Sequence, residues 1–239
     1  MGIEKAIAFA PFLYLMPKDT WYSIKYKSER ECNEWLYQSL KDYPNIFGFI
    51  TVNPKNPESC DILTEYINKD FVGIKIHPAV FQIKLDDPSL DRFYSIVEKL
   101  NVPILFHTDV HGWKINEYRP ILLDNVAYKH PKLKIIIEHG HSSLFFNEIL
   151  AVLINNSKVW NNFPVNVGIT SNFSLNDKNR LLLIRDSIGA ERMVYGLDYP
   201  FHNAEILKKD IEFINNTFSQ EESDLILGKN LERIIRDVF

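Results

Sequence analysis

Short apolar segments alternate with longer amphipathic ones along almost the whole chain, and this alternation limits the possible folds more than any other feature. Seven segments are mostly apolar and rich in β-branched and aromatic residues: Lys5–Ala10, Ile46–Asn53, Phe71–His77, Pro103–His107, Leu133–His139, Pro164–Ile169 and Arg192–Leu197. The segments after them have apolar residues at helical spacing: Glu29–Lys41, Pro57–Asn68, Ser89–Leu100, Glu117–Lys129, Ser143–Asn155, Lys178–Ile188 and Ala204–Phe218. The pattern predicts repeated βαβ units around a parallel sheet.

The number of predicted strands indicates an α/β fold like the (β/α)8 TIM barrel, incomplete at its N-terminus. The 239 residues fit one such domain, spanning 1–239, with no change of composition that would mark a second. Eight parallel strands close a barrel, whereas seven leave an edge exposed. Because no unit precedes Lys5–Ala10, the missing strand would be the first. An exposed edge also favours a homodimer.

Composition points to a small-molecule substrate. There are 27 basic and 31 acidic residues, interspersed along the chain, and the net charge of −4 indicates no nucleic-acid or membrane surface. The longest apolar run, from Ala6 to Met16, contains Pro11 and is too short for a membrane helix. Cys32 and Cys60 form no CxxC motif, which favours a protein of the reducing cytoplasm without disulfides or a thiolate zinc site.

Polar residues close four of the predicted strands. His77 ends GIKIHP, His107 lies in VPILFHTD, His139 in KIIIEHGH and Asp198 in MVYGLDYP. Barrel enzymes build their sites at the carboxyl ends of strands, and imidazoles with a carboxylate can hold a divalent ion that activates water. A single such histidine often only binds a loop carbonyl, but several strand ends together favour a metal site.

These segments resemble, in order, those of the amidohydrolase-related barrel enzymes, in the branch that contains aminocarboxymuconate-semialdehyde decarboxylase and related hydrolases. GIEKAIAF resembles the second strand of that family, GFITVNP the third, GIKIHPAVFQIKLDD the fourth, VPILFHTD the fifth, IIIEHGH the sixth, YGLDYPF the eighth and LILGKNLERII the closing helix. The resemblance implies that His107 is a metal ligand, that His139 binds metal or polarises water and substrate, and that Asp198 binds metal and shuttles a proton. The implied cofactor is a divalent metal, first zinc, with manganese, iron or cobalt as alternatives.

The chain departs from that family at its start, where an HxH pair on the first strand would supply two further ligands. No such pair precedes GIEKAIAF, and His139 and His141 form HxH only in the sixth strand. Three explanations stay open. The start is misassigned or the chain is truncated, the barrel is degenerate and only binds a ligand, or His111 or His141 replaces the pair.

Further candidates surround the predicted barrel mouth. Lys75 and His77 share one face of a strand, and both are predicted to contact substrate. For Lys75, a carboxylated metal bridge and an ion pair with a carboxylate are the alternatives. Loop residues His111, Trp113 and His202 are further substrate-binding candidates, against the alternative of a solvated loop.

Two other residues are assigned structural roles. Glu138 precedes His139 and is predicted to point away from it. Asn230 is expected to pack the final helix.

The function predicted from these features is that of a metal-dependent hydrolase of small carbonyl, carboxylate, amide or lactone compounds. Metal-activated water would attack, and Asp198 and His139 would be the catalytic residues. The first alternative is non-oxidative decarboxylation at the same site. The alternative from another class is a degenerate or truncated barrel that only binds a ligand.

Overall fold

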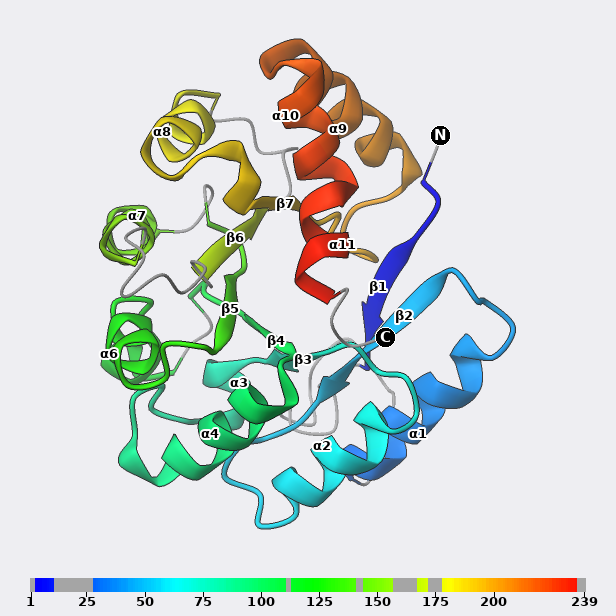
Figure 1. Ribbon diagram of the computed structural model, residues 1–239, viewed down its shortest axis with the longest axis vertical. Coiled ribbons are helices and arrows are strands. Elements are labelled where there is room, and N and C mark those ends of the chain that lie inside the picture. Colours follow the sequence, from blue (N-terminus) through cyan, green and yellow to red (C-terminus); the bar gives the residue numbers. More distant parts are fainter. Residues whose placement is uncertain are drawn as a thin grey trace.

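Seven parallel strands form one sheet whose order in space follows the order in the chain (Figure 1). The computed structural model describes residues 3–10, 28–110, 113–140, 144–156, 167–171 and 178–235. The strands are β1 Ala6–Phe9, β2 Ile46–Thr51, β3 Gly73–Ile76, β4 Pro103–Phe106, β5 Lys134–Ile137, β6 Val167–Ser171 and β7 Met193–Tyr195. All six neighbouring pairs are parallel. The predicted α/β barrel with seven recognisable strands is confirmed.

Helices surround the curved sheet, as Figure 1 shows. They are α1 Glu29–Leu40, α2 Ser59–Ile67, α3 Pro78–Phe81, α4 Asp91–Leu100, α5 Ile115–Tyr118, α6 Leu122–Lys129, α7 Phe146–Asn155, α8 Lys178–Ile188, α9 Ala204–Thr217, α10 Gln220–Asp224 and α11 Asn230–Ile235. The prediction of one helix over Glu117–Lys129 is wrong, because the chain breaks into α5 and α6 around Pro120, whose ring removes a backbone donor. Of the predicted strand Pro164–Ile169, residues 164–166 lie outside the described residues.

The core has two parts, one between sheet and helices and one inside the barrel. The inner part contains Phe49 of β2, Leu105 of β4 and Ile136 of β5, together with Ile235 of α11. Ile7, Phe9, Leu231 and Ile234 pack against it. Figure 1 shows α11 lying between β7 and β1, so the last helix places apolar side chains where the two edge strands leave the barrel open.

Polar contacts fix α11 to both edges. The Asn230 side-chain amide donates to the carbonyl oxygens of Ala190 (2.8 Å) and Met193 (2.7 Å), at the start of β7. Glu232 forms an ion pair of 2.8 Å with Lys5, which precedes β1. The prediction that Asn230 packs the final helix is confirmed, and its amide does so by satisfying two backbone acceptors.

A glycine lets the inner core close. A Cβ atom on Gly73 of β3 would lie 2.5 Å from the ring of Phe49, which is buried inside the barrel. We therefore expect Gly73→Ala to lower the free energy of unfolding by about 1–3 kcal/mol through overpacking, measured by urea denaturation. Gly228→Ala is the control, because nothing lies within 4 Å of its Cβ position. If the two variants were equally stable, the close approach of Gly73 to Phe49 would be refuted.

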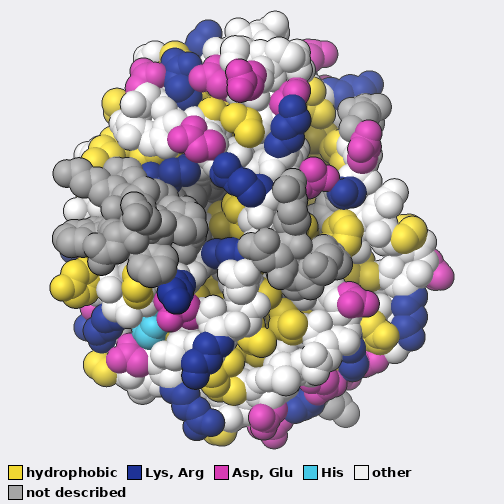
Figure 2. All heavy atoms as spheres, in the orientation of Figure 1, with side chains coloured by type: hydrophobic (Ala, Val, Ile, Leu, Met, Phe, Trp, Pro, Cys, Tyr) yellow, Lys and Arg dark blue, Asp and Glu magenta, His cyan; other side chains and the backbone are white. Residues whose placement is uncertain are grey.

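Charges on the surface are mixed in sign. Figure 2 shows basic and acidic side chains interspersed over the drawn face, without an extended area of either sign. Within the described residues, every helix is too short or too polar to cross a bilayer.

Candidate functional site

The carboxyl ends of β3, β4 and β5 bring several predicted residues to one level. Ile76 pairs with Phe106, and Phe106 pairs with Ile137, at the last position of each strand. The residues that follow are His77, His107 and Glu138. The His107 amide donates to the Ile76 carbonyl (3.0 Å) and the Glu138 amide to the Phe106 carbonyl (2.9 Å), which extends the register past the strands.

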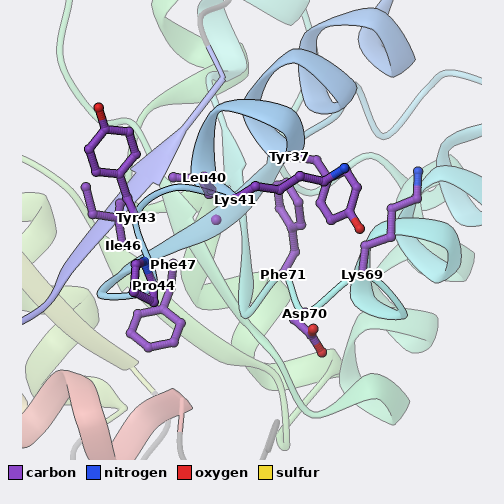
Figure 3. Close-up of a pocket in the computed structure, with 11 residues that line it drawn as sticks. Tyr37, Leu40, Lys41, Tyr43, Pro44, Ile46, Phe47, Lys69, Asp70 and Phe71 are labelled. Carbon is purple, nitrogen blue, oxygen red and sulfur yellow. The ribbon is translucent and has the colours of Figure 1, made fainter.

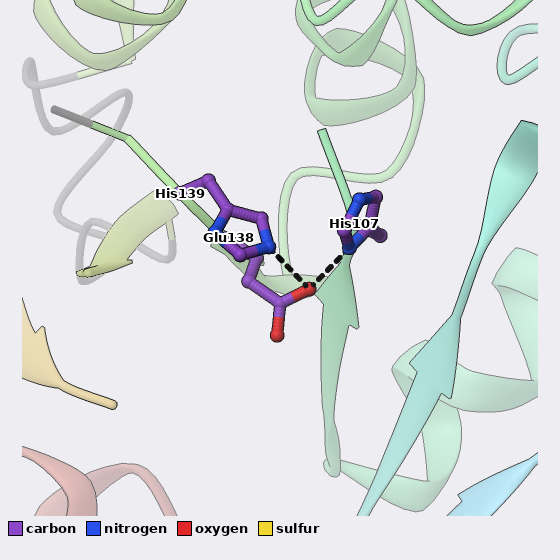
Figure 4. Close-up of side chains that lie close together, drawn as sticks. All are labelled: His107, Glu138 and His139. Carbon is purple, nitrogen blue, oxygen red and sulfur yellow. Dashed lines mark hydrogen bonds and ion pairs between the residues drawn. The ribbon is translucent and has the colours of Figure 1, made fainter. Parts of the chain in front are cut away.

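One carboxylate oxygen is the centre of this cluster. Oε2 of Glu138 lies 2.8 Å from Nδ1 of His107 and 3.6 Å from Nε2 of His139. Figure 4 shows both imidazoles directed at this oxygen. The Nζ atom of Lys75 contacts the same oxygen. The structure thus brings His107 and His139 together, as predicted, and it places Lys75 in an ion pair with the Glu138 carboxylate, which was one of the two predicted alternatives.

The prediction that Glu138 points away from His139 is wrong. Along β5 the inward residues alternate, so that Ile136 faces the inner core and Glu138, two residues on, faces the same way. Regular alternation would then turn His139 outward. Its backbone instead has φ +57°, a left-handed conformation that redirects the histidine to the Glu138 carboxylate. The inward parity of β5 was the signal in the sequence that could have identified Glu138.

The ring of His107 is held between two other imidazoles. His77 stacks on it with ring centroids 4.0 Å apart, and His139 meets it edge-on at 4.6 Å. His77 also caps α3 by accepting a hydrogen bond from the Val80 amide (3.4 Å). Its side chain is therefore engaged in positioning His107 and α3, and its predicted substrate contact stays a prediction.

Burial and charge set the protonation states of the cluster. Burial lowers the pKa of His107 to about 3, although the Glu138 carboxylate opposes this effect. His107 is therefore neutral near pH 7, the form in which imidazole binds metal. Burial alone would raise the pKa of Glu138, but the charge of Lys75 and the hydrogen bond with His107 hold that pKa well below its ordinary value. Glu138 is therefore an ionised carboxylate.

The donor set suits a divalent metal ion. One ligand atom each from His107, Glu138 and His139 lies within 4.8 Å of the others. Two imidazole nitrogens and a carboxylate oxygen are ligands that zinc and similar divalent ions accept. The predicted third ligand was Asp198, whereas the group that the structure brings together has Glu138 in that position.

Asp198 follows β7 and is half-buried at the same end of the barrel. Its φ is +62°, unusual for a residue with a side chain, and its carbonyl accepts from the amides of Phe201 (3.0 Å) and His202 (3.3 Å). Burial lowers the pKa of Lys75, while the charges of Glu138 and Asp198 raise it. Asp198 therefore lies close enough to Lys75 to act on it electrostatically, and its metal-binding and catalytic roles stay predictions.

The remaining predicted substrate residues lie in the loops. Trp113 is half-buried and stacks on Tyr118 with ring centroids 6.0 Å apart. His202 is half-buried, with Nδ1 3.0 Å from the Leu197 carbonyl oxygen. His111 and His141 lie outside the described residues.

A pocket of about 410 Å³ lies at the other end of the strands (Figure 3). It is lined by residues at the end of α1 and at the amino ends of β2 and β3, among them Tyr37, Lys41, Phe47 and Phe71. Because chemistry on parallel barrels lies at the carboxyl ends of strands, we assign the candidate site to the histidine cluster and not to this pocket.

The part of the sequence that matches a known family spans nearly the whole barrel. The family model described as Amidohydrolase matches residues 7–236. The chain belongs to the amidohydrolase family. No protein of curated function matches it in sequence.

Solved structures share the fold of this amidohydrolase. A 5-carboxyvanillate decarboxylase from Novosphingobium aromaticivorans, complexed with manganese and 4-hydroxy-3-methoxy-5-nitrobenzoic acid, has 17% identity and a TM-score of 0.74 over 98% of this chain and 77% of that chain. A 2,6-dihydroxybenzoate decarboxylase from Rhizobium has 20% identity and a TM-score of 0.68 over 87% and 76%. An uncharacterised TIM-barrel protein from Bordetella bronchiseptica has 18% identity and a TM-score of 0.74 over 99% and 79%. At these identities the likeness shows the TIM-barrel fold.

Proposed function

We propose that the protein is a metal-dependent enzyme that removes the carboxyl group of small aromatic acids without oxidation. The observation that carries this proposal is the cluster of His107, Glu138 and His139, whose ligand atoms lie within 4.8 Å of one another at the carboxyl ends of β4 and β5. The decarboxylases that share the fold, and the manganese in one of them, favour this alternative over the hydrolase that we first expected.

The residues of the cluster would hold the metal ion. His107 in its neutral form, the ionised Glu138 and His139 would supply the ligand atoms, with Asp198 as a further candidate. A divalent ion bound there would supply positive charge that polarises the oxygen atoms of the substrate. Zinc remains our first expectation for the metal, and manganese is the alternative that the fold relatives favour.

The chemical step needs one proton donor. The bond between the ring carbon and the carboxylate carbon breaks, its electron pair stays on the ring carbon, and carbon dioxide leaves. Asp198 delivers the proton that takes the place of the carboxyl group and regains a proton from water. His139, turned toward Glu138 by its left-handed backbone, would polarise the substrate in the alternative in which it is not a metal ligand.

Substrate contacts and surroundings complete the proposal. Trp113 and His202 are the loop residues that we expect to touch the substrate, with His111, Lys75 and His77 as further candidates. The expected partner is a small molecule, and a cytoplasmic location and a homodimer stay predictions.

The test is an assay of carbon dioxide release that compares the wild type with a variant of the proposed proton donor, Asp198. Purified protein loaded with Zn²⁺ or Mn²⁺ is given 2,6-dihydroxybenzoate and 5-carboxyvanillate, and released carbon dioxide is measured. Asp198→Asn should lower kcat by about 100- to 10,000-fold without changing the melting temperature. The control is His130→Gln, since His130 ends α6 at the far end of the barrel. Release of an alcohol or amine from ester or amide substrates, without carbon dioxide, would instead support the hydrolase.

A further inference from the structure

The ammonium group of Lys75 forms an ion pair with the carboxylate of Glu138, which is one of the candidate metal ligands. Its Nζ contacts Oε2 of Glu138, the oxygen that both His107 and His139 also face. Three nitrogen-bearing side chains therefore converge on one oxygen, and the ion that the ligand set suits would have to approach the same atom. Lysine and metal ion need the same acceptor.

Burial keeps Lys75 at that position. The residue is 1% exposed, and its Nζ lies 4.9 Å from the centre of the Phe9 ring, inside the barrel. Its register partner on β4 is the buried Leu105, and Phe49 and Ile136 of the inner core leave the carboxylate of Glu138 as the contacted acceptor. Lys75 is consequently a buried part of the site rather than a surface lysine.

The charges of the cluster cancel when no metal is present. The ammonium of Lys75 offsets the charge of the Glu138 carboxylate that it contacts, whereas Glu138 without the lysine would carry an uncompensated negative charge. A divalent cation binds more tightly to a site of negative charge than to a neutral site that already holds a cation. The lysine thus acts against metal binding at the position where the ligand geometry favours it.

We propose that Lys75 is a built-in counter-cation that competes with the divalent metal ion for Glu138 and sets the metal affinity of the site. This inference rests on the proposed function, because it assumes that His107, Glu138 and His139 are the ligands. It assigns Lys75 to control of metal loading. Metal binding then requires the ammonium to leave the carboxylate, so the site fills only at metal concentrations high enough to displace it.

The test is a metal titration of the full-length protein stripped of metal. Isothermal titration calorimetry with Mn²⁺ and with Zn²⁺ compares the wild type, Lys75→Met and Lys69→Met. Lys69 pairs with Glu34 and Glu65 at the other end of the barrel and is the matched control. We expect Lys75→Met to lower the Kd for each metal at least about tenfold and Lys69→Met to leave it unchanged. A Kd for Lys75→Met equal to or higher than that of the wild type overturns the inference.

Two further variants distinguish an error in the proposed metal ligands from an error in the proposed role of Lys75. Lys75→Arg keeps the charge and can bind the carboxylate through two nitrogens, so its Kd should equal or exceed that of the wild type. This comparison also decides the question if Lys75→Met does not fold without metal, since a Kd lower than that of the wild type for Lys75→Arg would contradict the competition. The double variant His107→Ala, His139→Ala tests the ligands. If it retains wild-type metal binding, the proposed site itself is wrong; if it loses metal but Lys75→Met binds no tighter, only the role of Lys75 is wrong.

Discussion

Glu138→Gln is expected to lower the free energy of unfolding by about 3–5 kcal/mol, because it leaves the buried Lys75 without the carboxylate that it contacts. Lys75 is 1% exposed and the Glu138 side chain 13% exposed, so water cannot replace the lost carboxylate. The variant also loses the hydrogen bond to His107. Urea denaturation of metal-free protein, followed by far-ultraviolet circular dichroism, measures the change.

Two comparisons show whether the loss comes from the uncompensated charge. The double variant Lys75→Met, Glu138→Gln removes both charges and should recover a large part of the lost stability. Glu205→Gln breaks an exposed ion pair between Glu205 and Lys209 on α9, and should leave stability close to that of the wild type. If Glu138→Gln cost no more than Glu205→Gln, the buried pair would contribute nothing and our account of the barrel mouth would be wrong.

Asn230→Ala should lower the free energy of unfolding by about 2–4 kcal/mol. Asn230 is fully buried, and its amide is the donor for the carbonyl oxygens of Ala190 and Met193. Each buried acceptor left without a donor costs about 1–3 kcal/mol, and the cavity adds to that cost. Because these contacts attach α11 to β7, the variant should also expose the inner core, and the same denaturation experiment measures both effects through the midpoint and the slope.

A variant that replaces one side-chain nitrogen by an oxygen, without a change of size, isolates the effect of the hydrogen bonds. Asn230→Asp keeps the shape but replaces the amide donor by an oxygen that faces two carbonyl oxygens, so it should destabilise at least as much as alanine. Asn125→Ala serves as the surface control, because the Asn125 amide is exposed and donates to a side chain, that of Asp86, rather than to buried backbone. Stability of Asn230→Asp close to that of the wild type would show that the two donated hydrogen bonds are not what holds α11.

Local patterns in the sequence determined the elements of the fold and part of the site. The alternation of strand and helix periodicities identified all seven strands, because buried parallel strands are continuously apolar and the helices between them are amphipathic. His107 and His139 were correctly placed at the mouth of the barrel, because polar residues that close apolar parallel strands lie at the carboxyl ends of those strands. The break at Pro120 was also readable from the sequence, although we predicted one continuous helix there.

Only the tertiary structure decided which of these residues meet. Lys75 and Glu138 are 63 residues apart, and their contact depends on the register of β3, β4 and β5, which no local pattern encodes. The left-handed backbone at His139 breaks strand alternation. The sequence pattern therefore assigned Glu138 and His139 to opposite faces, although the His139 imidazole faces the Glu138 carboxylate. The position of α11 between β7 and β1 likewise depends on where the sheet ends in space. Periodicity reports which face of an element is buried, whereas the partners across a barrel are set by the packing of the whole chain.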